Sequence, residues 1–161
     1  MAATSPIARL LLTSSVTGAA TTLALLLLSS KDTGHPAAAL NATSHILWGD
    51  EATKYDRVDV RHTLVGALLN VGAISLWSAL QLLLPQPRSL LAAARNAIAV
   101  TGLAYATDFH FVPARLTPGF ERRLSKKSLL GTYVELAASL TVSALAARPR
   151  QQRANEGPRA R

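Results

Sequence analysis

Three side chains at the ends of two long apolar segments could handle a proton or a metal ion. Asp108 and His110 close one segment, and His62 opens another. Such side chains offer the oxygen and nitrogen ligands that metal ions take, and a pair of histidines could hold haem b. Asp108-x-His110 is an unspecific motif, however, and no HExxH accompanies it. We therefore expect interfacial hydrogen bonding and head-group contact here, with a metal, proton or haem site as the alternative.

Polar side chains within the apolar segments form a second group, because an intramembrane charge is costly and needs a partner. Glu135 and Asn70 lie at matching depths of roughly 10–12 Å from the same membrane face, at a helical rise of about 1.5 Å per residue. This predicts an Asn70–Glu135 hydrogen bond, with a proton or cation site at Glu135 as the alternative. Arg95 lies near the opposite face, where its long side chain can reach the interface as an anchor.

A basic cluster follows the third apolar segment. Arg115, Arg122 and Arg123 lie around Thr117-Pro118-Gly119, whose proline and glycine suit a type II turn. Arginine binds carboxylates and phosphates through two parallel hydrogen bonds. The cluster predicts contacts with anionic head groups of the lipid bilayer, or with an acidic partner.

Four apolar segments must position these side chains. Each has about 20 mostly apolar residues, the length that a membrane-spanning helix requires. The expected spans are 7–29, 62–84, 89–112 and 128–147. Because Pro85 and Pro87 prevent one continuous helix, the second and third spans should form an antiparallel hairpin. The sequence predicts an all-α integral membrane bundle of four transmembrane helices over residues 1–147.

Composition agrees with a membrane protein. Of 161 residues, 49% are hydrophobic and only 16% are charged, against roughly 25% charged in soluble domains. The absence of cysteine excludes disulfides and thiolate chemistry. The net charge of +8 comes from residues that flank the apolar segments, and no nucleic-acid-binding pattern is present, so we expect a bilayer and no nucleic acid. The basic tail, residues 148–161, is expected to be disordered.

The first connection, residues 31–61, holds the apolar stretch His45-Ile46-Leu47-Trp48. Tryptophan favours the membrane interface, which predicts either a short surface helix or a loop with one anchoring ring. The preceding span could instead be a signal peptide cleaved near Ala37-Ala38-Ala39. Its apolar run exceeds the usual 7–15 residues of a signal peptide, so we expect a retained anchor.

Topology and packing are less constrained. Lysine and arginine divide eight to nine between the two sides, so the positive-inside rule sets no orientation. The long, charged first connection favours termini on the inside. Ser14, Gly18 and Thr22 recur every fourth residue, which predicts a close helix contact within the chain or, alternatively, a dimer interface.

Residues Val112 to Glu121 read Val-Pro-Ala-Arg-Leu-Thr-Pro-Gly-Phe-Glu. This stretch resembles the last loop of a family of uncharacterised small polytopic bacterial membrane proteins, as does Leu47-Trp48-Gly49-Asp50. The likeness covers about residues 41–147. It implies a membrane class, and with 13 Arg to 4 Lys it favours a bacterial inner membrane, but it assigns no activity.

No nucleophile–base pair, Walker loop or dinucleotide fingerprint is present, so we expect no catalytic residue, metal or cofactor. The favoured function is a non-enzymatic accessory or scaffold subunit, or a small oligomeric transporter, with itself or another membrane protein as partner. The alternative is a membrane-embedded enzyme or redox carrier that uses His62, Asp108, His110 and Glu135.

Overall fold

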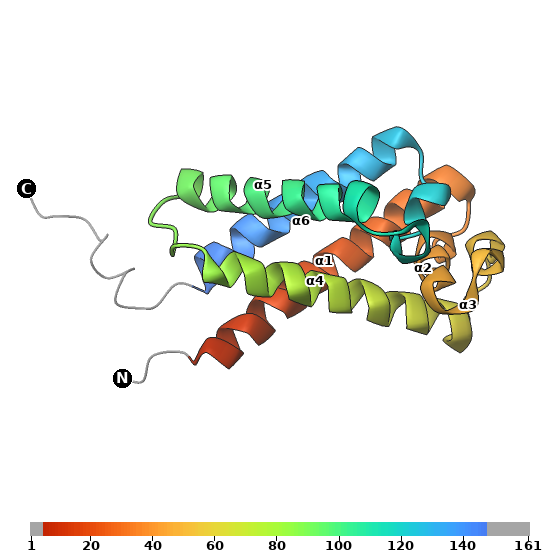
Figure 1. The fold of residues 1–161 in the computed structure, drawn as a ribbon, viewed down its shortest axis with the longest axis horizontal. Coiled ribbons are helices and arrows are strands. Elements are labelled where there is room, and N and C mark those ends of the chain that lie inside the picture. Colours follow the sequence, from red (N-terminus) through yellow and green to blue (C-terminus); the bar gives the residue numbers. More distant parts are fainter. Residues whose placement is uncertain (1–4, 148–161) are drawn as a thin grey trace, which may run out of the picture.

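Four long helices form the body of the protein in the computed structural model, which describes residues 5–147 (Figure 1). They are α1 (Pro6–Thr33), α4 (Val65–Leu83), α5 (Leu90–Ala106) and α6 (Lys126–Ala146). A π-helical turn, η2 (Val60–Leu64), leads into α4, and another, η3 (Thr107–Phe111), continues α5. With these turns, all four helices are long and apolar enough to cross a membrane. The predicted all-α fold with four candidate spans is confirmed, with boundaries within a few residues of those expected.

Serine side chains start three of these helices. Ser5, Ser89 and Ser125 each accept a hydrogen bond from a backbone N–H of the first turn, at 3.1, 3.1 and 3.2 Å. Such caps satisfy amide groups that have no partner within the helix. At the other end of α1, Gly34 adopts a left-handed φ of 75°, which stops the helix.

Helix α1 lies between α4 and α6, and α5 packs mainly on α6 (Figure 1). A Cβ atom at Gly18 would lie 3.8 Å from Val71 and 4.0 Å from Ile74, both on α4. The hydroxyls of Thr17 and Ser143 lie 3.3 Å apart and join α1 to α6. The predicted face of small residues therefore makes contacts within the chain.

The first connection folds into the end of the bundle. Its helix α2 (Ala38–Thr43) is buried at every residue, and α3 (His45–Trp48) is one short turn that buries His45 and exposes Trp48. Of the two arrangements considered for His45–Trp48, the structure has a short helix, but α2 was not predicted. Helix α2 can approach α4 this closely because Gly66 of α4 has no side chain. A Cβ at Gly66 would lie only 1.8 Å from the Leu40 carbonyl oxygen.

Three short 3₁₀ helices lie at the same end of the molecule as α2 and α3. They are η1 (Asp50–Lys54), η4 (Ala114–Leu116) and η5 (Phe120–Arg122). We call this assembly, residues 34–59 and 112–125, the cap. The start of α1, the α4–α5 connection and the end of α6 lie at the opposite end of the bundle (Figure 1). The basic tail predicted to be disordered falls outside the described residues.

Apolar side chains lie on the outside of the bundle and many polar ones inside it. Large exposed residues include Leu11, Leu23, Leu68 and Leu76, while Thr13, Thr17, Ser78 and Ser143 are buried. This distribution suits a lipid environment, in which helices associate through small and hydroxyl side chains. Ala37-Ala38-Ala39 are buried too, and α1 packs within the bundle. Retention of α1 as an anchor stays a prediction.

Candidate functional site

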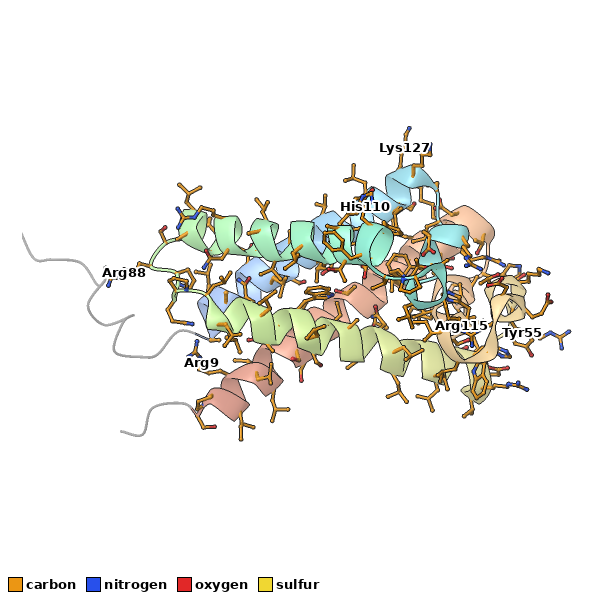
Figure 2. The ribbon with its side chains drawn as sticks, in the orientation of Figure 1. Arg9, Tyr55, Arg88, His110, Arg115 and Lys127 are labelled. Atoms are coloured by element: carbon orange, nitrogen blue, oxygen red, sulfur yellow. The ribbon has the colours of Figure 1, made fainter. Side chains whose placement is uncertain are left out.

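The arginine cluster of the third connection binds the first connection, and Figure 2 labels one of its members, Arg115. Arg115 donates from Nε to the Ile46 carbonyl at 2.9 Å and from Nη2 to the Leu47 carbonyl at 3.2 Å. These bonds satisfy carbonyl groups at the end of α3. Contact of this side chain with anionic head groups stays a prediction.

The other two arginines form ion pairs with the same connection. Arg122 lies 2.6 Å from Asp50 and holds the pKa of that carboxyl below its usual value through hydrogen bonding and charge. Arg123 pairs with Asp56 and also donates to the Thr53 carbonyl at 2.9 Å. The acidic partner that the sequence analysis considered is thus provided by the chain itself.

Two buried polar residues that the sequence analysis missed hold the cap together. The side-chain amide of Asn41 donates to the carbonyls of Tyr55 and Arg57 at 2.9 Å each, and its oxygen accepts from Thr63 at 2.6 Å. His45 Nδ1 lies 2.9 Å from the Ala42 carbonyl. A polar residue within an alanine-rich stretch is the signal that could have indicated them.

The predicted glycine turn places the third connection against α2. Gly119 has a φ of 83°, as position i+2 of a type II turn requires. A Cβ there would lie 2.4 Å from the Ala42 carbonyl oxygen and 2.6 Å from His45 Nδ1. Both the backbone conformation and the close approach require glycine at this position.

His62, Asp108 and His110 find separate partners, so the cluster considered for a metal, proton or haem is not formed. His62 lies 2.9 Å from Asp59 and stacks on Tyr55, with 4.1 Å between ring centroids. The His62 backbone N–H lowers the pKa of Asp59. His110 is exposed and meets the Tyr105 ring edge-on at 6.0 Å. Within residues 5–147, no group of three His, Asp or Glu side chains could hold a metal ion.

The predicted Asn70–Glu135 hydrogen bond is also not formed. Asn70 donates to Thr22 at 3.4 Å, while Glu135 lies beside Thr21 and Ser139 with its Oε2 buried and unpartnered. The physical reason is that α4 and α6 each pack on α1 more extensively than on each other. Asn70 and Glu135 therefore do not contact each other, although the sequence places them at the same expected depth in the membrane.

Arg95 lies near the end of the bundle opposite the cap. Its side chain is exposed on α5, at the start of that helix. The next residue, Asn96, donates to the Pro85 carbonyl at 3.0 Å and so fastens the short connection of the predicted antiparallel hairpin. An interfacial anchor at Arg95 stays a prediction.

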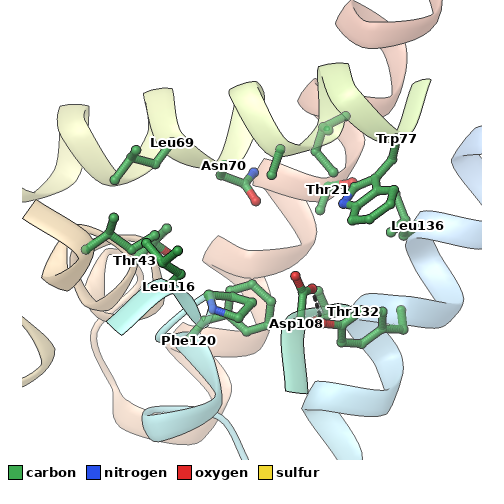
Figure 3. Close-up of a pocket in the computed structure, with 15 residues that line it drawn as sticks. Thr21, Thr43, Leu69, Asn70, Trp77, Asp108, Leu116, Phe120, Thr132 and Leu136 are labelled. Atoms are coloured by element: carbon green, nitrogen blue, oxygen red, sulfur yellow. Dashed lines mark hydrogen bonds between the residues drawn. The ribbon is translucent and has the colours of Figure 1, made fainter. Parts of the chain in front are cut away.

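A cavity of about 90 Å³ lies below the cap, between α4, α6 and the end of α5 (Figure 3). The Asp108 carboxylate points into this space and accepts a hydrogen bond of 2.6 Å from Tyr133. The Asn70 side chain points into it from the opposite wall. The Thr21 residue, whose hydroxyl is buried beside Glu135, also lines the cavity. Apolar residues form most of the remaining wall, among them Leu69, Ile74, Trp77, Leu116, Phe120 and Leu136.

The cavity unites residues that the sequence analysis had assigned to different groups. Asp108 was considered with two histidines and Asn70 with Glu135, but the fold places Asp108 and Asn70 on facing walls. Tyr133 was missed, although it is the only aromatic residue of α6. The arrangement presents a carboxyl group and an amide group within an apolar and aromatic wall.

No protein-family model, curated protein or solved structure matches this chain. The resemblance to small bacterial membrane proteins therefore stays a prediction.

Proposed function

We propose that this multi-pass protein is a non-enzymatic binding protein or small transporter that takes a small organic ammonium ion into its intramembrane cavity. The observation that carries the proposal is the Asp108 carboxylate, which points into the cavity and has Tyr133 as its one hydrogen-bond donor in the described part of the chain. An ionised carboxylate in an apolar site is costly unless a cation and further donors compensate it. A ligand ammonium group supplies both.

The other cavity walls favour the same ligand class. The amide oxygen of Asn70 offers an acceptor for a further N–H group of an ammonium ion. Trp77 and Phe120 provide aromatic surface, to which a cation is attracted. The aliphatic wall residues suit a short hydrocarbon chain on the ligand.

Packing supports a binding or transport role more than catalysis. Helix α4 packs mainly on α1, and α5 mainly on α6, so the cavity lies where the two helix pairs meet. Helix α1 also packs on α6 as extensively as α5 does, so separation of α4 from α5 is the movement that would open the cavity while these larger contacts stay in place. The alternative of an enzyme or redox carrier loses support because His62, His110 and Glu135 do not line the cavity.

We place the protein in a bacterial inner membrane, which the 13 arginines to 4 lysines and the loop resemblance favour. An accessory role beside itself or another membrane protein is compatible with the exposed apolar helix faces. Crosslinking in native membranes, followed by purification, tests for such a partner.

Ligand binding by the purified protein in detergent micelles tests the proposed function. Butylammonium and butanol have similar shapes and differ in charge, so calorimetric titration of both isolates the carboxylate's contribution. We expect butylammonium to bind at least about tenfold more tightly, since a charged hydrogen bond is worth about 1.5–3 kcal/mol. Asp108→Asn should remove this preference.

Glu135→Gln is the matched control, because it neutralises another intramembrane carboxyl that does not line the cavity. This variant should bind butylammonium as the wild type does. Equal affinity for butanol and butylammonium, or no binding of either by the wild type, would overturn the proposal without requiring any variant to fold.

A further inference from the structure

An apolar groove of about 420 Å³ lies on the outside of the bundle, between α5 and α6. Its walls are made by Ile98, Gly102 and Tyr105 on α5 and by Leu130 and Val134 on α6. Gly102 deepens the groove, because nothing lies within 4 Å of where its Cβ would be. The groove is distinct from the cavity below the cap, although Tyr133 borders both.

Two lysines stand at the cap end of this groove. Lys126 and Lys127 precede Leu130 by one helical turn, so they share its side of α6. Both are exposed, and within residues 5–147 neither forms a salt bridge (Figure 2 labels Lys127). His110, also exposed, lies beside Tyr105 at the same end.

Unlike these lysines, the three arginines of the cap have partners within the chain. Arg122 and Arg123 pair with Asp50 and Asp56, and Arg115 donates to two backbone carbonyls. The lysine pair is therefore unpaired positive charge at the cap end of the groove, whereas Arg95, three residues before Ile98, lies toward the opposite end. An apolar channel that ends in unpaired positive charge complements a molecule with a hydrocarbon chain and an anionic head.

We propose that this groove is a binding site for one anionic phospholipid, with an acyl chain along Gly102 and the phosphate at Lys126 and Lys127. The groove faces outward from candidate spans, where lipid chains surround the protein. Lysines near an anionic lipid head group contribute favourably to binding. At the same end of the groove, Tyr105 of α5 meets His110 of η3 edge-on.

Native mass spectrometry of the full-length protein, exchanged from nanodiscs of equal parts phosphatidylglycerol and phosphatidylcholine, tests the site. We expect one phosphatidylglycerol to be retained in preference to phosphatidylcholine. Each lysine is worth about fivefold in affinity, so Lys126→Gln with Lys127→Gln should weaken retention about 30-fold. Lys31→Gln with Lys54→Gln removes the same charge elsewhere and should retain the lipid.

A second pair of variants tests the groove itself. Gly102→Leu fills it and should displace the lipid, whereas Gly72→Leu adds the same side chain on α4, where there is also open space, and should not. Unchanged retention in the lysine variant or in Gly102→Leu overturns the site. A dimer that Gly102→Leu dissociates would also overturn it, because the groove would then hold a second copy of the chain.

Discussion

At the scale of single residues, glycine sets how closely the cap approaches the helices. Gly66 of α4 lies against the Leu40 carbonyl, and Gly119 lies against the Ala42 carbonyl. These two contacts fix α2 from both sides, one to a span and one to the third connection. A backbone carbonyl inside a helix cannot move away as a flexible side chain can, so neither contact tolerates a Cβ.

We expect Gly66→Ala to destabilise the protein by at least about 1–3 kcal/mol, the usual cost of overpacking. Its Cβ would lie 1.8 Å from the Leu40 oxygen, which forces α2 out of position. Gly72→Ala on the same helix meets nothing within 4 Å and is the control. Unfolding titrations with a denaturing detergent measure both. Equal stability of the two variants would mean that α2 does not pack on α4 as described.

At the scale of elements, the cap is a pair of connections joined by arginine. The third connection supplies the guanidinium groups, and the first supplies carboxylates and free carbonyls. The Arg123 side chain is 18% exposed, while that of Arg122 is 33% exposed. The close partner of Arg122, Asp50, is itself 78% exposed, and its second partner, Glu121, lies 4.0 Å away. The more enclosed pair should contribute more, because water screens it less.

We therefore expect Arg123→Met to reduce stability by about 1.5–3 kcal/mol, the range for hydrogen bonds to charged groups. Arg122→Met should cost about 0.2–1 kcal/mol, as surface ion pairs do. Thermal unfolding in detergent and hydrogen exchange of residues 50–56 compare the two variants. The reverse order of effects would show that the cap depends on the exposed pair.

At the scale of the whole molecule, the four candidate spans predict that the two ends of the bundle lie on opposite sides of a membrane. The cap contains the first and third connections, and the second connection lies at the other end with the start of α1 (Figure 1). Such an arrangement fixes the relative sides of all connections, although the even division of positive charges leaves the absolute orientation open.

Reporter fusions after Gln86 and after Arg150 should therefore report one compartment, and fusions after Asp50 and Gly119 the other. An alkaline phosphatase and a fluorescent protein, each active on only one side of a bacterial inner membrane, give complementary readings. Opposite compartments for Gln86 and Arg150 would show that α5 or α6 does not cross.

Local sequence determined the spans, their ends and the glycine turn, because apolar length, capping serines and proline or glycine act over a few neighbouring residues. It also indicated some of the polar residues that need partners, such as Asn70 and Asp108, but not Asn41 or His45. Contacts between helices were not determined in this way: equal depth suggested Asn70 with Glu135, yet packing of α4 and α6 on α1 separated them.

Only the tertiary structure brought Asp108, Tyr133 and Asn70 to one cavity and directed the arginines to the first connection. Both sets of contacts depend on how the helices are rotated and how far apart they lie. Small residues along the full length of each helix interface decide this geometry. The pattern of polar and apolar residues along one segment does not indicate which other segment packs against it. The chemistry of each side chain was readable from the sequence, and its partner was decided by the fold.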